Sequence, residues 1–498
     1  MIARLAFACA VLALGTASAA DAPVTLRIGT TAMPPSVGNP FRTPGTPHSM
    51  TWASLFDGLT RINELGELVP WLAVSWENID PLTWRFKLRP GVTFSNGAPF
   101  TADAVLNVVE FFHSPAAARE MTPRTLSFVS SARKIDDLTV DLITDAPTPS
   151  LPRALSILYM VEPGQWRKLG PDGFATAPIG TGPFALDKAE VNAWKLSAFR
   201  KSWRAPKVDR LEWNASPDNS SRVQALLAGR LDIALGVGPD DIDVIIAAGG
   251  GSVSWKTSSI WSIQFHHNMD TPLKDVRVRQ ALNYAVDRKA LSEGLLGGKA
   301  VAASQPGSSV VYGHDPSIPP IPYDPATAKK LLSEAGYPNG FKFVVQGVIG
   351  AGASDAAMYQ KIAQDLLAIG VTMEIQPFPL SELFRGVIED RWDGDAFGNS
   401  FTAEPTVDVL QVVRNHSCLS PKPLYCDQRI MPVIKAAVAE FDPAKGLEMR
   451  HQIMRFYRDQ YMALFLYELP RWAGLRQGVT GFKDAHGFIN LHQITKQH

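Results

Sequence analysis

The residues best suited to chemistry are two cysteines near the C-terminal end of the chain, Cys418 and Cys426. The remaining cysteine, Cys9, lies within the first twenty residues. An even pair of thiols predicts a disulfide where the protein resides in an oxidising compartment. His416 lies two residues before Cys418, so a metal site is the alternative, although no C-x-x-C or H-E-x-x-H spacing supports it.

Three further patterns carry reactive residue types. Ser131 begins an S-x-x-K sequence, but the S-D-N and K-T-G elements that accompany it in Ser-Lys enzymes are missing, which indicates chance. His266 and His267 are adjacent in an expected strand, so their rings point to opposite faces and cannot share a metal. Asp393 and Asp395 are two residues apart and could share a strand face, but acid–base catalysis needs partners that the sequence does not show.

Common enzyme motifs are missing: the sequence contains no G-x-S-x-G, no Walker A loop, no G-x-G-x-x-G and no H-E-x-x-H. We therefore expect no enzymatic activity, no cofactor and no resident metal, with a secreted hydrolase as the remote alternative. The chain has 48 lysines and arginines against 48 aspartates and glutamates. This balance gives no reason to expect a nucleic-acid partner.

The N-terminus has the order of an export signal. The basic MIAR is followed by the apolar LAFACAVLALG and by the small residues TASAA. This order predicts a secretory signal peptide over residues 1–20, cleaved near Ala19 or Ala20. The apolar run is shorter than the ~20 residues that a membrane-spanning helix needs, and no later segment is long enough. We therefore expect the protein in the periplasm.

Strand-like and helix-like segments alternate along the rest of the chain, which predicts the α/β class. Residues 24–30 alternate apolar and polar side chains, as a half-buried strand does. Thr101 precedes a helix over 102–112 with one apolar stripe. Asp324 caps another helix, and Gly336 ends it. At 498 residues, the chain is too long for one core, so two or three domains are expected.

Six strings of the chain are similar, in this order, to one family: LFDGLTRINELGELVPWLAVSWE, LTWRFKLRPGVTFSNGAPFTADAV, APIGTGPF, LLAGRLDIAL, DVRVRQALNYAVDR and YDPATAKKLLSEAGYPNGF. They resemble the peptide/opine/nickel-type solute-binding proteins of ABC importers, family 5. The similarity runs from about residue 50 to about residue 485. Each string is short, but six in the family's order are specific. Their residues form turns, caps and packing positions, so they indicate the fold and not the ligand.

The resemblance implies a two-lobe periplasmic-binding-protein (Venus-flytrap) fold with an extra subdomain inserted in the N-terminal lobe. Lobe I would comprise residues 21–262, with the inserted subdomain near 55–178, and lobe II residues 263–473. The tail 474–498 would return to lobe I, and strands over IWSIQFHHN and ALFLYELPRW would cross between the lobes. Such a monomer would capture a small organic solute, peptide-like or opine-like, and deliver it to a membrane-embedded ABC permease with its ATPase.

The resemblance also implies where the ligand binds. In relatives that bind peptides, the ligand adds as a strand to both cleft walls. Here the walls would be TPGTPHS and AFGNSFTAEPTVDVL. The expected ligand-binding residues are Pro44, Gly45, Thr46, Trp261, Trp392, Gly398, Asn399, Ser400, Thr402 and Glu404. The two tryptophans either line the cleft or belong to the core.

One departure from the family concerns the ligand's amino group. The position of the Asp that pairs with a peptide ammonium is Thr402 here, or Ala403 if the alignment shifts by one. A buried ammonium needs a carboxylate, and Glu404 and Asp395 are near in sequence as possible substitutes. The sequence does not name the ligand. Binding of a metal or haem, or service to a chemoreceptor, is the alternative on the same fold.

Overall fold

The computed structural model describes residues 22–43, 45–266, 270–348, 355–378, 392–414, 416–420 and 422–497. The predicted signal peptide (1–20), Pro44 and His267 lie outside the described residues. Within the described ranges, no helix is both long enough and apolar enough to cross a membrane.

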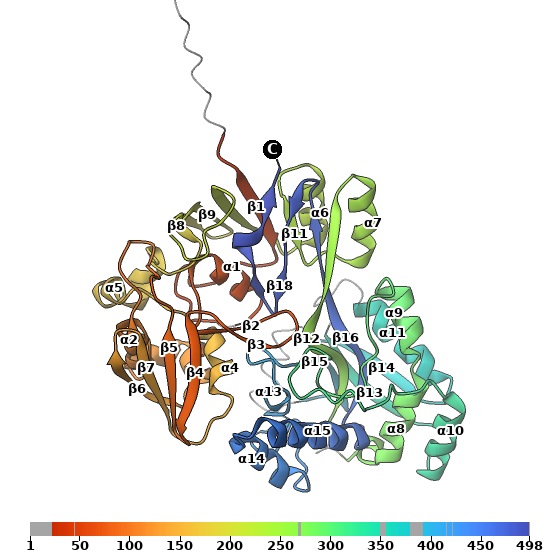
Figure 1. The fold of residues 1–498 in the computed structure, drawn as a ribbon. Helices are drawn as coiled ribbons and strands as arrows, with labels where there is room; N and C mark the ends of the chain where they lie inside the picture. Colours follow the sequence, from red (N-terminus) through yellow and green to blue (C-terminus); the bar gives the residue numbers. More distant parts are fainter. Residues whose placement is uncertain are drawn as a thin grey trace, which may run out of the picture.

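A ten-stranded mixed sheet runs through the molecule (Figure 1). In spatial order its strands are β14 (Thr372–Phe378), β13 (Lys342–Val348), β15 (Ala396–Thr402), β12 (Gly251–Phe265), β16 (Ala463–Leu475), β11 (Ile233–Leu235), β1 (Thr25–Thr30), β10 (Arg210–Ala215), β9 (Ala193–Ala198) and β8 (Phe184–Glu190). The strand predicted over residues 24–30 is therefore confirmed as β1, and its buried side chains include Leu26 and Ile28.

The two long central strands, β12 and β16, join the two halves of this sheet. They pair antiparallel from Gly251 and Leu475 at one end to Gln264 and Ala463 at the other. At the first end β16 also pairs with β11, and toward the second end β12 pairs with β15. The register shifts between Lys256 and Ile260, and such a bulge bends a strand locally.

A separate antiparallel sheet, β4-β5-β7-β6, forms the part at the lower left of Figure 1. Its strands are β4 (Ala73–Asp80), β5 (Thr83–Leu88), β7 (Thr139–Thr144) and β6 (Val129–Asp136). Helix α2 (Ala102–Phe112) packs on this sheet through Val105 and Val108, which are fully buried. Thr101 is the residue before the helix, as predicted, but its hydroxyl makes no capping hydrogen bond.

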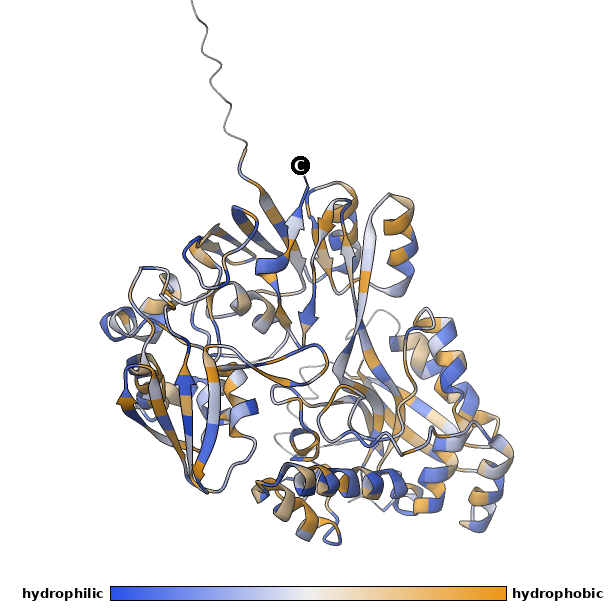
Figure 2. Cartoon of the chain, in the orientation of Figure 1, coloured by the Kyte–Doolittle hydropathy of each residue, from blue (hydrophilic) through white to orange (hydrophobic). Residues whose placement is uncertain are grey.

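Helices cover both halves of the large sheet. The longer ones are α1 (His48–Leu55), α5 (Pro163–Thr176), α6 (Asn219–Leu227), α7 (Pro239–Ala247), α8 (Val276–Ala285), α9 (Arg288–Leu295), α10 (Pro325–Glu334), α11 (Asp355–Leu367), α14 (Met431–Ala439) and α15 (Pro443–Asp459). Asp324 caps α10 as predicted, because its carboxylate accepts a hydrogen bond from the backbone N–H of Thr327. Figure 2 shows both hydrophilic and hydrophobic stretches on α8, α10 and α15, as expected for helices with one buried face.

The short elements are the helices α3 (Met121–Thr125), α4 (Leu151–Ala154) and α13 (Val409–Arg414), the 3-10 turns η1 (Pro115–Arg119), η2 (Leu155–Ile157), η3 (Pro272–Lys274) and η4 (Leu491–Gln493), and the strands β2 (Thr60–Ile62), β3 (Leu68–Pro70), β17 (Val479–Thr480), β18 (Asp484–Ala485), β19 (Phe488–Ile489) and β20 (Thr495–Lys496). Strands β2 and β3 form one hairpin, and β18 and β19 form another. Both hairpins contribute to the site described below.

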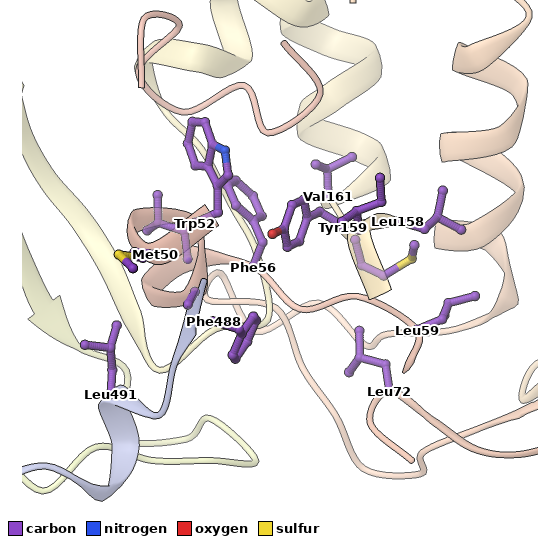
Figure 3. Close-up of a cluster of buried hydrophobic side chains, with 14 of the residues drawn as sticks. Met50, Trp52, Phe56, Leu59, Leu72, Leu158, Tyr159, Val161, Phe488 and Leu491 are labelled. Carbon is purple, nitrogen blue, oxygen red and sulfur yellow. The ribbon is translucent and has the colours of Figure 1, made fainter. Parts of the chain in front are cut away.

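The hydrophobic cores follow a two-lobe α/β fold, as the sequence predicts. One core gathers residues 26–235 with the C-terminal segment 473–494. The other cores lie mostly in residues 260–467. Figure 3 shows how the C-terminal segment joins the first core: Phe488 and Leu491 lie beside Phe56 and Met50, close to α1.

The predicted disulfide is confirmed. Cys418 and Cys426 are bonded, with their Cα atoms 4.8 Å apart. The alternative, a metal site with His416, is wrong because the sulfur of Cys418 is used by the bridge. The Nε2 atom of His416 instead lies 2.9 Å from Oε1 of Gln264, and burial lowers the pKa of this histidine to about 4.

Candidate functional site

Two sets of contacts connect the lobes near the centre of the molecule. In the first, the Thr46 hydroxyl, which precedes α1, donates to the Glu404 carboxylate at 2.9 and 3.0 Å. The backbone N–H of Thr46 points to the same carboxylate at 3.4 Å. Gly45 has a φ of +90°, and a Cβ built there would lie 3.5 Å from Oε2 of Glu404. The predicted residues Gly45, Thr46 and Glu404 are therefore brought together.

The second set of contacts comes from Arg153 on α4. Its Nε atom donates to the carbonyl of Thr406 at 2.7 Å, and its Nη2 atom donates to the carbonyls of Gly66 and Val407 at 2.8 and 2.9 Å. Burial lowers the pKa of this guanidinium. Thr406 and Val407 lie two and three residues after Glu404, so one short segment of the second lobe is held by two side chains of the first.

A small cavity of about 50 Å³ lies beside these contacts. It is lined by Gly45, Ser49, Thr60, Arg61, Ile62, Ser156, Ile157, Tyr159, Glu404, Pro405, Val407, Ala485, His486, Gly487 and Phe488. Sites for small organic ligands usually measure roughly 300–1,000 Å³. A solute could therefore enter this site only if the lobes move apart.

Arg61, in β2, is the principal cation of the cavity. Its side chain is 5% exposed, and the guanidinium carbon lies 4.4 Å from the ring centroid of Trp71 and 3.9 Å from that of Phe488. Nη2 donates to the carbonyl of Phe488 at 3.2 Å, while Nη1 is buried and has no hydrogen-bond partner among the described residues. Burial, and then the neighbouring Arg204, lowers the pKa of Arg61 to about 9, so it stays charged at neutral pH.

The β18–β19 hairpin also lines the cavity. His486 and Gly487 form its turn, and both have positive φ, which suits a tight two-residue hairpin. A Cβ at Gly487 would lie 2.6 Å from the Ser49 hydroxyl, so only glycine allows this approach to α1. Burial raises the pKa of Asp484 to about 6, and it lowers the pKa of His486 to about 4, which keeps that imidazole neutral.

The predicted second wall is strand β15. Gly398, Asn399 and Ser400 pair with β12 on one edge. On the other edge β13 pairs only with Ala396 and Phe397, so from Gly398 onward no strand of the described chain pairs with that edge. Addition of an extended ligand chain along this edge stays a prediction.

The remaining predicted ligand-binding residues lie outside the cavity. Trp261 is buried in the core of the second lobe. Trp392 stacks on Phe397 with centroids 4.4 Å apart and lies 4.7 Å from the His266 ring. Thr402 is exposed at the end of β15, where its hydroxyl accepts the backbone N–H of Glu404 at 3.3 Å. Contacts of these three side chains with a ligand stay predictions.

The other residues with reactive side chains, Lys134 and Asp395, make ion pairs or hydrogen bonds within the fold. Lys134 of the S-x-x-K string lies 3.0 Å from Asp103 and 2.7 Å from Asp137. Asp395 accepts the backbone N–H of Val344 at 2.7 Å, while Asp393 is exposed. Within the described ranges, no cluster of three or more His, Cys, Asp or Glu side chains could hold a metal ion.

Sequence reasoning missed Arg61, Arg153, Asp484 and His486. Arg61 and Arg153 are single charges inside otherwise uncharged segments, LTRIN and LPRAL, and that placement is the signal that could have been read. The His486–Gly487 pair between short strands was a readable turn signal as well.

This geometry, two α/β lobes joined by long strands and in contact around a small charged cavity, is that of a solute-binding protein. The family model "Bacterial extracellular solute-binding proteins, family 5 Middle" matches residues 67–409. The chain belongs to this family, which confirms the resemblance inferred from the six strings. It is a family of binding proteins and not of enzymes.

The chain is also similar to individual proteins. The chain is 33% identical over 339 residues to Heme-binding protein A of Haemophilus influenzae, a match that spans 61% of each chain. It is 29% identical over 331 residues to the Glutathione-binding protein GsiB of Pectobacterium atrosepticum, spanning 65% of this chain and 63% of the relative. The chain thus matches less than two thirds of the length of these relatives. Among solved structures, HbpA2 from Haemophilus parasuis superposes with a TM-score of 0.82 at 21% identity, over 95% of this chain and 100% of that one.

Proposed function

We propose that this chain is an exported binding protein that captures a small organic solute between its lobes and delivers it to an ABC permease. The observation that carries this proposal is the cavity lined by both lobes, with Thr46 and Glu404 in contact across it. Family membership supports the same class of function.

Lobe movement follows from the connections between the lobes. The long strands β12 and β16 join them, and a register shift between Lys256 and Ile260 interrupts the pairing. The contacts of Thr46 and Arg153 can form only when the lobes are together. A solute that touches both lobes would therefore shift an open–closed equilibrium toward the closed state, and the permease would recognise that state.

The finer features of the proposal concern processing and boundaries. The signal peptide is removed near Ala19 or Ala20, and the mature protein acts in the periplasm as a monomer without a nucleic-acid partner. Lobe I comprises residues 21–262 with the tail 474–498, and lobe II comprises 263–473. The inserted subdomain near 55–178 contains the four-stranded sheet. The distribution of the hydrophobic cores supports this division.

The names of the two relatives mention different ligands, haem for one and glutathione for the other. Haem is therefore kept as a second candidate ligand, and a peptide-like or opine-like solute is the first. The test is native mass spectrometry of protein purified without denaturation. We expect a stoichiometric organic solute that dissociates when the protein is unfolded and rebinds without chemical change. Conversion of the solute to a product, or failure of any solute to rebind, would contradict the proposal.

A further inference from the structure

Arg61 is a buried cation without an ion-pair partner among the described residues. Its side chain is 95% buried, and no carboxylate of the described residues lies within ion-pair distance of it. An arginine does not give up its proton in a protein, so burial alone cannot remove this charge. A buried cation without a partner is strongly unfavourable.

The neighbouring acids are committed elsewhere. Asp57 accepts hydrogen bonds from four donors, which are Trp71 Nε1, Trp203 Nε1, Thr181 Oγ1 and Arg204 Nε. Arg204 is its ion-pair partner at 2.8 Å, and both side chains are almost completely buried. Asp57 therefore already neutralises a different guanidinium.

The other acids face other groups. Glu404 accepts from Thr46, and Glu64 lies 3.6 Å from Lys483. Asp484 accepts the N–H of Gly487 through Oδ1 at 2.6 Å, and its Oδ2 has no hydrogen-bond partner among the described residues, but neither oxygen forms an ion pair with Arg61. Arg471 also acts on both hairpin residues, Asp484 and His486. Arg153 acts on His486, and Arg61 itself acts on Asp484. Asp57, Asp484 and Glu64 therefore act on the charge of Arg61 from a distance, but none of them forms an ion pair with its guanidinium.

The surroundings of Arg61 hold its guanidinium plane in place. The rings of Trp71 and Phe488 lie within cation–π distance of the guanidinium carbon, and the carbonyl of Phe488 accepts from Nη2. Ring contacts do not satisfy the N–H donors that lie in the guanidinium plane, and Nη1 has no acceptor among the described residues. Two adjacent N–H groups in one plane match the two oxygens of a carboxylate.

We propose that Arg61 binds a carboxylate of the captured solute, so that this protein selects carboxylate-bearing, net anionic solutes. The inference rests on the proposed function and adds the chemical class of the ligand.

The test compares matched pairs of probes by calorimetry: succinate with succinamide, N-acetylalanine with its primary amide, and benzoate with benzamide. The wild type should bind at least one acid and bind its amide roughly 10- to 150-fold more weakly, the range expected for hydrogen bonds between charged groups. Arg61→Met should weaken the acid by a similar factor and leave the amide unchanged. Arg61→Lys keeps the charge without the planar pair, so it should lose several-fold and serves if Arg61→Met does not fold.

Arg210→Met is the matched control, because Arg210 is an exposed arginine on β10. It should bind each acid as the wild type does. Equal binding of an acid and its amide, equal loss of both in Arg61→Met, or binding of free-amine cations alone would overturn the proposal and leave the proposed function standing. Absence of binding by every acid would also overturn it, and the native solute would then decide the proposed function separately.

Discussion

The contact between Thr46 and Glu404 allows a direct test of lobe closure. Thr46→Val replaces the hydroxyl by a methyl group of similar size, so packing changes little while the hydrogen bond at 2.9 Å is lost. Hydrogen bonds to a charged group contribute about 1.5–3 kcal/mol, and we expect about 1–2 kcal/mol here because both side chains are half-buried. The contact exists only in the closed state. Its loss should therefore make lobe closure less favourable and leave the free energy of unfolding unchanged.

The expected result is an affinity for the native solute that falls about 5- to 30-fold, with an unchanged midpoint of urea unfolding. Thr125→Val is the control, since that hydroxyl bonds the carbonyl of Met121 in its own helix at 3.0 Å. It should bind like the wild type. An unchanged affinity in Thr46→Val would refute the claim that this contact stabilises closure. A fall in unfolding stability that matches the loss of affinity would show that the contact acts in folding instead.

Three further predictions concern other parts of the chain. Replacing Cys418 and Cys426 by alanine should lower the free energy of unfolding by about 2.5 kcal/mol, because the bridge closes a loop in the unfolded chain, and urea titration with and without reductant measures this. Burial raises the pKa of Asp484 to about 6, so the free energy of unfolding should fall as pH rises from about 4 through 6. Asp484→Asn should avoid this loss, which is about 3 kcal/mol in order of magnitude. Parallel profiles of unfolding free energy against pH for the two proteins would contradict the prediction. Thr402→Asp should raise the affinity for dipeptides with a free amino group, and calorimetry that shows tight binding of such dipeptides to the wild type would argue against Thr402 as the amine position.

Much of the fold could be predicted from the sequence because its signals are local. The strand at residues 24–30 and the cap at Asp324 depend on neighbours within a few residues, and both are confirmed. The disulfide between Cys418 and Cys426 required only the count of thiols and the export signal. The capping hydrogen bond of Thr101 is missing, although the helix begins where predicted.

The site was harder to predict because it depends on contacts between distant segments. Thr46 and Glu404 are 358 residues apart, so only a family resemblance could place them together. Arg61 and Asp484 come from opposite ends of the chain, and their burial is set by packing that no local pattern encodes. Trp261 could be read either as a cleft or as a core residue from its sequence, and the structure places it in a core.

Small-angle X-ray scattering tests the central claim, that a solute closes the two lobes, most directly. The protein is first freed of its native solute by unfolding and refolding, and scattering is then measured with and without that solute at saturation. The account predicts a smaller radius of gyration in the bound state, because contacts such as that of Arg153 with Thr406 then hold the lobes together. A radius of gyration that does not change at saturation would contradict it.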